Sequence, residues 1–470
     1  MAKLSDWGII GLGTIGSNLA INFSRNEFKL SVYNRNLKGI EENVAKNFVK
    51  KNDSLKDVIP FDNLDSFVKS LKKPRKILIL IPSGKPIDEM IKSLLNYLSK
   101  DDIIIDGGNS YFNDTQRRES FLKRKKINFL GIGISGGTMG ARNGPSIMIG
   151  GSEVVYNKVK RDLKKISAVN YLNKYCCNRV GPSSSGHYVK MIHNGLEYVE
   201  MQLIAECYDF MKTEMNFDNY KISEVFNKWL KTSSNSYLLN ISSDILKYKE
   251  NGSFIIDEII DKSENKGTGV WAAISGIELG VPNTLMTLAL NSRYISFQKE
   301  TRVKNFKLRK KRKYNGKIST NDLKLVYDFS RIINFYQGFN VLEAASKKYN
   351  WELNLSNISS LWSNGSILKS DLVFLLVKIL KDQTDILNSR IIYKNFISKF
   401  ETIKNIITTS QKGNTPLLLI SNSMSFFELI TQKVGTGNLI QAQRDYFGSH
   451  GINLKDSNKL FKYNWNDIKL

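Results

Sequence analysis

The segment WGIIGLGTIGSNLA, residues 7–20, decides the fold of the first third of the chain. An apolar run leads into Gly11, Gly13 and Gly16, spaced as Gly-x-Gly-x-x-Gly, and a helix-like stretch follows directly. Glycines at this spacing allow a tight turn and close approach of the backbone to a pyrophosphate, and the helix N-terminus offers free N–H groups. We predict a strand–turn–helix unit that binds a dinucleotide through Gly11, Gly13, Thr14, Ile15 and Gly16. A tight turn without a ligand is the alternative.

Further short apolar runs, separated by helix-like stretches, continue this pattern. They are KLSVYN at 29–34, KILILI at 76–81, DIIID at 102–106 and FLGIGIS at 129–135. This alternation predicts a parallel sheet with crossover helices. After residue 187 long segments of helical period replace the strand-like runs. We expect an α/β Rossmann-type N-terminal domain over 1–178, a large all-α domain for substrate binding and dimerisation over 179–435, and a short C-terminal tail over 436–470.

The composition excludes several classes of protein. The chain has 470 residues, a formal net charge of +25 and three cysteines. This length exceeds what one hydrophobic core usually serves, and three cysteines suit neither a disulfide framework nor a four-cysteine zinc site. The first ten residues lack the apolar stretch of a signal peptide, and the longest apolar runs fall far short of the roughly 20 residues of a membrane helix. We expect a cytoplasmic protein, not bound to a membrane, whose positive charge attracts anions.

The second predicted strand ends at Asn34 and Arg35 follows it, where this fold places the residue that reads the adenosine ribose. A carboxylate there would accept a hydrogen bond from a free 2′-hydroxyl and repel a 2′-phosphate. Neither residue is acidic, and Arg35 supplies a guanidinium that can fork onto a phosphate. The pair predicts NADP in preference to NAD. The alternative is that Arg35 is a solvated loop residue.

The segment GHYVKMIHNGLEY, residues 186–198, places four polar groups on one helical face. Lys190, His193, Asn194 and Glu197 stand at offsets 0, 3, 4 and 7, within about a 100° arc. Lys190 and Glu197 are separated by about 10 Å of helix rise, enough to reach opposite ends of a small polar substrate. A solvated strip is the alternative. With only three histidines in the chain, we expect no metal site.

Other glycine-rich and basic segments are candidates for anion binding. Two follow predicted strands, ISGGTMGARNGPS at 134–146 and DGGNS at 106–110, at the sheet edge where open α/β folds bind ligands. Two more are KGTG at 266–269 and QRDYFG at 443–448. Each could be a simple turn when taken alone.

Seven motifs follow one another across nearly the whole chain. In order, they are GLGTIGSNLA, YNR, GGNS, ISGGTMGARNGPS, GHYVKMIHNGLEY, NKGTGVWAAISGIELGVP and QAQRDYFGSH. Together they closely resemble the decarboxylating 6-phosphogluconate dehydrogenases of the pentose phosphate pathway. The resemblance implies oxidation of 6-phosphogluconate at C3 by NADP, loss of C1 as carbon dioxide, and release of ribulose 5-phosphate. It also implies a homodimer in which the tail of each subunit reaches into its partner.

The resemblance assigns roles by motif. Lys190 would take the C3 hydroxyl proton, and Glu197 would protonate C1 of the enediol that remains after decarboxylation. The cofactor would contact Gly11, Gly13, Thr14, Ile15, Gly16, Asn34, Arg35, Lys85 and Asn109. The substrate would contact Asn109, Ser135, Gly136, Gly137, His193, Asn194, Tyr198, Lys266, Thr268 and Arg293, with Arg444 and His450 lent by the partner subunit.

Two other functions compete with this one. A β-hydroxyacid dehydrogenase for a smaller substrate shares the first glycine loop, the Ser-Gly-Gly cluster and the Lys190 helix motif, but lacks KGTG and QRDYFG. From another class, the basic run KNFKLRKKRK at 304–313 could bind nucleic acid. No known nucleic-acid-reading module is present, so we expect no nucleic-acid partner.

Overall fold

Eight strands of the N-terminal region form one sheet in the computed structural model, which describes residues 4–265, 267–310, 312, 314–382, 385–455, 457 and 459–465. The strands are β1 (Trp7–Ile10), β2 (Leu30–Tyr33), β3 (Ile59–Phe61), β4 (Lys76–Ile79), β5 (Ile103–Asp106), β6 (Asn128–Ser135), β7 (Ser146–Gly151) and β8 (Cys177–Gly181). Their order is β3-β2-β1-β4-β5-β6-β7-β8, with β6 and β7 antiparallel and every other neighbouring pair parallel. The expected Rossmann-type sheet is confirmed. β8 crosses the boundary we placed after residue 178, because its pairing with β7 continues to Gly181.

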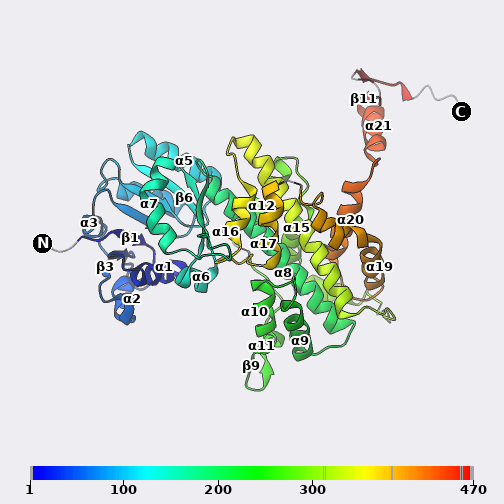
Figure 1. The fold of residues 1–470 in the computed structure, drawn as a ribbon, viewed down its shortest axis with the longest axis horizontal. Helices are drawn as coiled ribbons and strands as arrows, with labels where there is room; N and C mark the ends of the chain where they lie inside the picture. Colours follow the sequence, from blue (N-terminus) through cyan, green and yellow to red (C-terminus); the bar gives the residue numbers. More distant parts are fainter. Residues whose placement is uncertain are drawn as a thin grey trace.

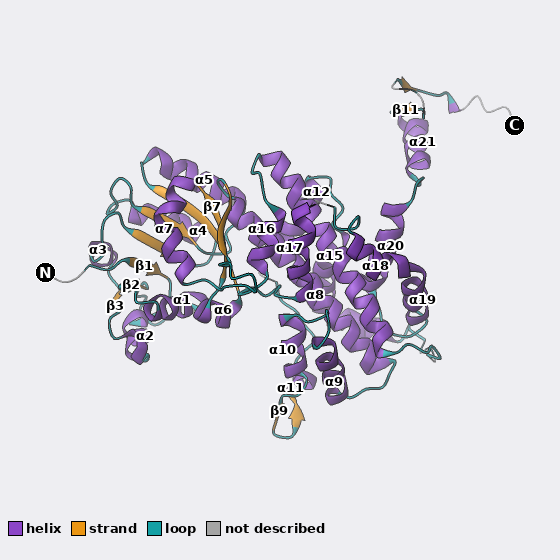
Figure 2. Cartoon of the chain, in the orientation of Figure 1, coloured by secondary structure: helices purple, strands orange, loops and turns teal. Residues whose placement is uncertain are grey.

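Helices cover both faces of the sheet, so the central strands are buried and rich in isoleucine, leucine and valine (Figure 2). The helices of this region are α1 (Thr14–Arg25), α2 (Val44–Lys50), α3 (Leu64–Lys69), α4 (Lys85–Leu94), α5 (Phe112–Arg124), α6 (Gly137–Asn143) and α7 (Glu153–Lys165), with a 3-10 turn at Asp53–Leu55. Because successive parallel strands need crossovers, these helices leave the carboxyl ends of β1, β4 and β5 at one common edge of the sheet.

The second region is almost entirely helical, as expected (Figure 1). Its helices are α8 (Ser185–Thr213), α9 (Asn219–Leu230), α10 (Tyr237–Ile245), α11 (Ile255–Glu258), α12 (Thr268–Glu278), α13 (Thr284–Phe297), α14 (Lys299–Phe306), α15 (Thr320–Tyr349), α16 (Leu355–Trp362), α17 (Asp371–Asp382), α18 (Arg390–Asn395), α19 (Phe400–Ser410) and α20 (Leu418–Thr431), with a 3-10 turn at Ile397–Lys399. A small hairpin pairs β9 (Lys249–Glu250) with β10 (Ser253–Phe254). No helix in the described part of the chain is long and apolar enough to cross a membrane.

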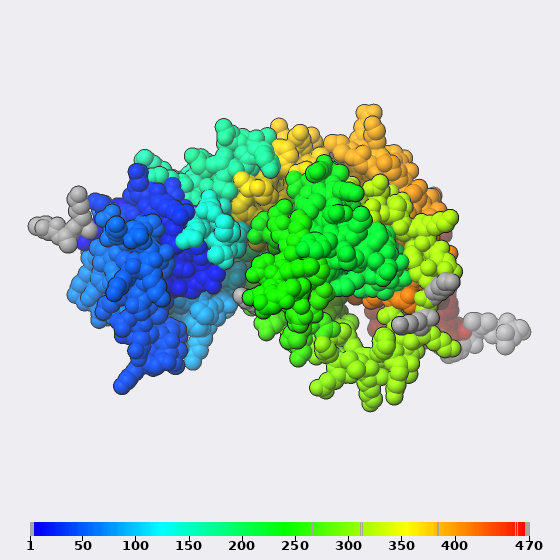
Figure 3. Space-filling model, turned by 90° about the horizontal axis from the view of Figure 1, so that it is seen from below, coloured from blue at the N-terminus to red at the C-terminus, as the bar shows by residue number. Residues whose placement is uncertain are grey.

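Helix α8 joins the two regions. Its first half packs on β6 and β7, and its length also contacts α12, α13, α15 and α20. Most of its side chains are buried as a result, including the polar Lys190 and His193. In Figure 3 the sheet region, blue to cyan, and the helical region, green to orange, form one continuous surface. The helix that carries the predicted catalytic groups therefore lies in the core between them.

The tail projects from the helical region (Figure 1). It consists of α21 (Gly437–Gly448) and a hairpin of β11 (Ile452–Asn453) and β12 (Leu460–Phe461). Asp445 holds the hairpin to the helix, because its carboxylate accepts hydrogen bonds from the Gly451 backbone N–H at 2.7 Å and the Trp465 ring N–H at 2.8 Å. The side chains of Leu439, Ile440 and Phe447 are exposed along this segment. The described residues of the tail thus form an arm with exposed apolar side chains.

Candidate active site

Lys190 lies where α8 crosses β6. A Cβ atom added to Gly133 of β6 would stand 2.3 Å from the Cβ of Lys190, so glycine is what lets the helix come this close. The lysine is only 7% exposed. Burial lowers the pKa of the Lys190 amine to about 8, although Glu197 acts in the opposite direction. A substantial fraction of the amine is therefore uncharged near neutral pH.

His193 connects the amine to the loop after β6. Its Nδ1 is 3.3 Å from the Lys190 Nζ, and its Nε2 lies 3.0 Å from the Ser135 hydroxyl and 2.7 Å from the Ser366 hydroxyl. Burial, and then the charge of Lys190, lower the pKa of His193 well below its ordinary value, so the ring is neutral. Both ring nitrogens thus contact protein atoms. Ser366 was not expected, because it follows α16, far along the chain, and no motif marks it.

Glu197 lies on the same face of α8 as Lys190 and His193. Its Oε2 is 3.6 Å from the Nδ1 of His193. Burial raises the pKa of the Glu197 carboxyl above its ordinary value, while Lys190 and then Arg293 oppose the shift. One helix face therefore carries an amine whose pKa is lowered and a carboxyl whose pKa is raised. The two pKa shifts have the directions that suit a base and an acid working in one site.

Residues from three helices adjoin this face. Asn194 donates a hydrogen bond from Nδ2 to the Thr268 hydroxyl at the start of α12, at 3.1 Å. The guanidinium of Arg293, on α13, lies 3.7 Å over the ring of Tyr198 on α8. Thr268 and Arg293 thus contact side chains of α8, and the charge of Arg293 also acts on Glu197. Lys266 lies outside the described residues.

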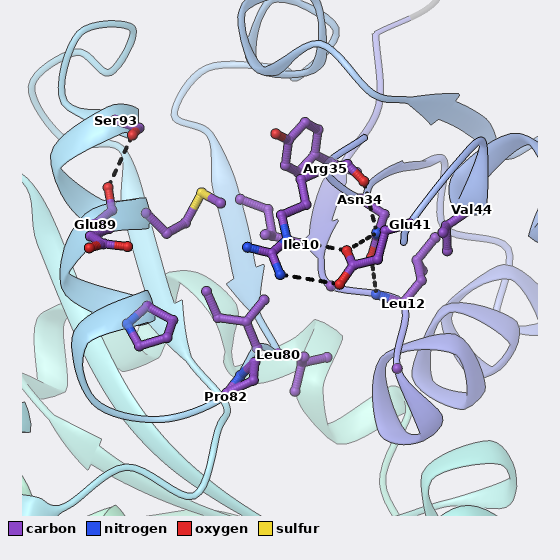
Figure 4. A pocket seen from close by; sticks show the side chains of 16 residues that line it. Ile10, Leu12, Asn34, Arg35, Glu41, Val44, Leu80, Pro82, Glu89 and Ser93 are labelled. Carbon is purple, nitrogen blue, oxygen red and sulfur yellow. Dashed lines mark hydrogen bonds and ion pairs between the residues drawn. The ribbon is translucent and has the colours of Figure 1, made fainter. Parts of the chain in front are cut away.

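The first glycine loop borders a cavity of about 500 Å³ (Figure 4). Gly11, Gly13, Asn34 and Arg35 line it, and α1 begins immediately afterwards with Gly13 as its N-cap. A Cβ atom on Gly16 would stand 1.9 Å from the carbonyl oxygen of Gly11. Glycine at position 16 is therefore needed for α1 to pack against the loop. The N-terminus of α1 carries no acidic residue in its first turn, which suits an anion.

Glu41, a carboxylate that the sequence analysis did not consider, also lines this cavity and pairs with Arg35. Arg35 donates from Nε to Oε2 and from Nη2 to Oε1 of Glu41, both at 3.2 Å. Glu41 reaches this position because the loop after β2 folds back, with a hydrogen bond from the Leu37 N–H to the Glu41 carbonyl oxygen at 2.8 Å. The residues that directly follow the strand do not reveal this carboxylate, because it comes from further along the loop.

Lys85 and Asn109, which the resemblance assigns to the cofactor, do not line this cavity. Lys85 begins α4 and pairs with Glu89 at 3.5 Å. Asn109 is exposed in the loop after β5. Ser135 contacts His193, and Gly136 and Gly137 form the turn into α6, both at positive φ. The binding roles of these five residues stay predictions.

Arg118 on α5 was not foreseen from the sequence. This buried guanidinium donates to the Gly84 carbonyl oxygen at 2.9 Å, to Asp88 at 2.8 Å and to Asp106 at 3.3 Å. It thus ties the loop before α4 to the end of β5 and, by donating to the Ser110 hydroxyl at 3.3 Å, to the loop after β5. Both loops lie at the edge of the sheet where the nucleotide cavity opens. Only the tertiary contact identifies this residue, because nothing in its local sequence distinguishes it from Arg117.

Arg444 and His450 do not join the site within one chain. Arg444 donates to the Gln441 side chain of its own helix at 3.2 Å, and His450 lies just beyond α21. Figure 1 shows α21 extending away from α8 and from the sheet.

Comparison with known proteins extends over the whole chain. Residues 6–181 match the family model for the NAD binding domain of 6-phosphogluconate dehydrogenase, and residues 186–465 match its C-terminal domain. The chain belongs to the 6-phosphogluconate dehydrogenase family. It is 37% identical to the decarboxylating 6-phosphogluconate dehydrogenase of Buchnera aphidicola subsp. Schizaphis graminum, covering 97% of this chain and 98% of the relative. The corresponding Escherichia coli K12 protein is 36% identical, with 98% and 99% covered.

A solved structure of a 6-phosphogluconate dehydrogenase family member superposes on nearly all of the chain. The Plasmodium falciparum 6-phosphogluconate dehydrogenase matches with a TM-score of 0.92 at 36% identity, covering 98% of this chain and 100% of that one. That protein has been described in its apo form and in complexes with its cofactor NADP+ and its substrate 6-phosphogluconate. The family resemblance drawn from the motifs is confirmed.

Proposed function

We propose that this protein oxidises 6-phosphogluconate at C3 with NADP, releases C1 as carbon dioxide and forms ribulose 5-phosphate. The observation that carries the proposal is the α8 face, where a buried lysine with a pKa of about 8 lies near a carboxyl whose pKa is raised. Membership of the family, at more than a third identity over the full length, supports the same reaction. The smaller-substrate alternative is not favoured, because both relatives match to their full length.

The residues around the cavity suit NADP. The backbone N–H groups at the start of α1 would hold its pyrophosphate, and Gly16 permits the close approach of helix and loop that this needs. Arg35, with Asn34 beside it, would contact the 2′-phosphate. NADP supplies the hydride acceptor of the reaction.

The side chains on α8 would move the protons. Uncharged Lys190 accepts the proton of the C3 hydroxyl as that carbon is oxidised, which makes the substrate a β-keto acid. As carbon dioxide leaves, Lys190 returns its proton to the C3 oxygen, and an enediol forms. Protonated Glu197 then donates a proton to the carbon that was C2 of the substrate and becomes C1 of the product, while Lys190 takes up the proton of the C3 hydroxyl and the ketone forms. The remaining contacts that we propose for the substrate come from Asn109, Ser135, Gly136, Gly137, His193, Asn194, Tyr198, Lys266, Thr268 and Arg293.

We also propose a homodimer in which Arg444 and His450 complete the partner's substrate pocket. The exposed apolar surface of the projecting arm supports this assembly, since such surfaces usually lie in interfaces. Arg444→Ala and Lys190→Met homodimers should each be inactive, and mixed subunits should regain activity because one pocket per heterodimer is intact. No recovery after demonstrated subunit exchange would refute the shared pocket.

A direct assay tests the reaction itself. Purified protein is mixed with 6-phosphogluconate and either NADP or NAD, and reduced nicotinamide and carbon dioxide are both measured. Equal amounts of the two products, formed faster with NADP, are expected. Reduction without carbon dioxide release, or activity only on a shorter unphosphorylated hydroxy acid, would contradict the proposal.

A further inference from the structure

Glu41 holds the guanidinium that the proposed cofactor phosphate would use. Two hydrogen bonds of 3.2 Å join Arg35 to the two carboxylate oxygens of Glu41 in a fork (Figure 4). Asn34 also donates from Nδ2 to Glu41 at 3.1 Å, and its Oδ1 accepts from the Leu12 N–H at 3.2 Å. Glu41 is thus connected through Asn34 to the glycine loop. Its carboxyl is ionised at neutral pH, because the hydrogen bond from Arg35 lowers its pKa.

This pairing has opposite consequences for the two cofactors. A 2′-phosphate at Arg35 would have to replace a carboxylate in the same fork, and the displaced charge would remain nearby because Glu41 also lines the cavity. A ribose with a free 2′-hydroxyl meets no such conflict, since a carboxylate accepts a hydrogen bond from a hydroxyl. The Arg35 side chain is 62% exposed and that of Glu41 34%, so the pair can open without a buried charge being left behind.

We propose that Glu41 is a specificity-determining residue that opposes the 2′-phosphate and thereby limits the preference for NADP over NAD. The inference rests on the proposed use of NADP. It assigns Arg35 and Glu41 contrary effects within one site: the guanidinium favours the phosphorylated cofactor and the carboxylate reduces that advantage. The NADP preference of this chain is then smaller than Arg35 alone would produce.

The test uses cofactor fragments, so that its readout does not depend on turnover. The dissociation constants of 2′,5′-ADP and 5′-AMP are measured by titration calorimetry for the wild type, Glu41→Gln and Glu41→Asp. Glu41→Gln keeps the size of the side chain and removes its charge. We expect the affinity ratio of 2′,5′-ADP to 5′-AMP to rise about tenfold, because one competing charge is removed from a charge-assisted contact. Glu41→Asp keeps the charge and should stay closer to the wild type.

Glu42→Gln is the matched control. It removes the same charge one residue further along, where the carboxylate accepts a hydrogen bond from the Gly39 N–H and does not contact Arg35. Its effect on the ratio should stay below about twofold, because separated surface charges are screened by salt. Thermal melts check that the variants fold. Glu41→Ala removes the same charge in a second way and should shift the affinity ratio in the same direction as Glu41→Gln.

The remaining outcomes would contradict either the role of Glu41 or the proposed NADP preference. An unchanged ratio in both Glu41→Gln and Glu41→Ala, or an equal rise in Glu42→Gln, overturns the role of Glu41 alone. A lower affinity of Glu41→Gln for 2′,5′-ADP also overturns it, since Glu41 would then orient Arg35 for the phosphate. A wild type that binds 2′,5′-ADP no better than 5′-AMP rejects the proposed NADP preference, and a rise of the ratio in Glu41→Gln would then still support the opposing role of Glu41.

Discussion

Replacing Lys190 with arginine separates proton transfer from charge attraction. Burial lowers the pKa of Lys190 from an ordinary 10.5 to about 8. At pH 7 about one lysine in ten is then uncharged, compared with about one in three thousand at the ordinary value, a gain in base of roughly 300-fold. Arginine keeps the positive charge but does not lose its proton in this pH range. A base at this position is therefore lost in Lys190→Arg, whereas a purely electrostatic contact is kept.

Steady-state kinetics with 6-phosphogluconate and NADP measures the difference. Both Lys190→Arg and the uncharged Lys190→Met should lose at least about 100-fold in kcat, the usual contribution of a positioned base. Their dissociation constants for NADP should be unchanged, since Lys190 does not line the nucleotide cavity. Lys212→Met, on the same helix but paired with Asp257, is the control that should remain active.

The pH profile of the wild type provides a second readout. The protonated amine cannot accept a proton, so kcat/KM should rise about tenfold per pH unit below 8 and level off above it. Two results would refute the assignment of Lys190 as the base. One is a Lys190→Arg variant that retains more than about a tenth of the wild-type kcat, and the other is a wild-type kcat/KM that does not change between pH 6 and 8.

Three further substitutions test other parts of the structure. Arg35→Glu should weaken NADP relative to NAD by more than about tenfold in competition titrations, because it replaces a phosphate donor with a second negative charge; an unchanged ratio would remove Arg35 from the site. Gly16→Ala should lower the free energy of unfolding by about 2 kcal/mol in denaturant melts, since its Cβ would meet the Gly11 carbonyl oxygen at 1.9 Å; wild-type stability would show that the loop can shift. Arg118→Met should cost about 3 kcal/mol in the same measurement, because it leaves the buried Asp106 without its cation; a loss below about 1 kcal/mol would contradict the clamp between the two loops.

The sequence predicts well the parts of this molecule that depend only on residues close to one another along the chain. The apolar run and spaced glycines of residues 7–20 determine β1, the turn and α1, because strand, turn and helix are all set by neighbours along the chain. The 3.6-residue period likewise places Lys190, His193 and Glu197 on one face of α8 whatever the rest of the fold does. The order of motifs is also a property of the sequence, and it is enough by itself to indicate the family.

Tertiary structure alone decides what surrounds those residues. Burial of Lys190 against Gly133 lowers its pKa, and burial depends on a contact between segments that are far apart in the chain. Ser366 reaches His193, and Arg118 reaches Asp106 and Gly84, through the same kind of long-range packing. Local patterns fix which side chains share a helix face or a loop. Solvent exclusion and charge pairing depend on all atoms nearby, so they are defined only once the chain has folded.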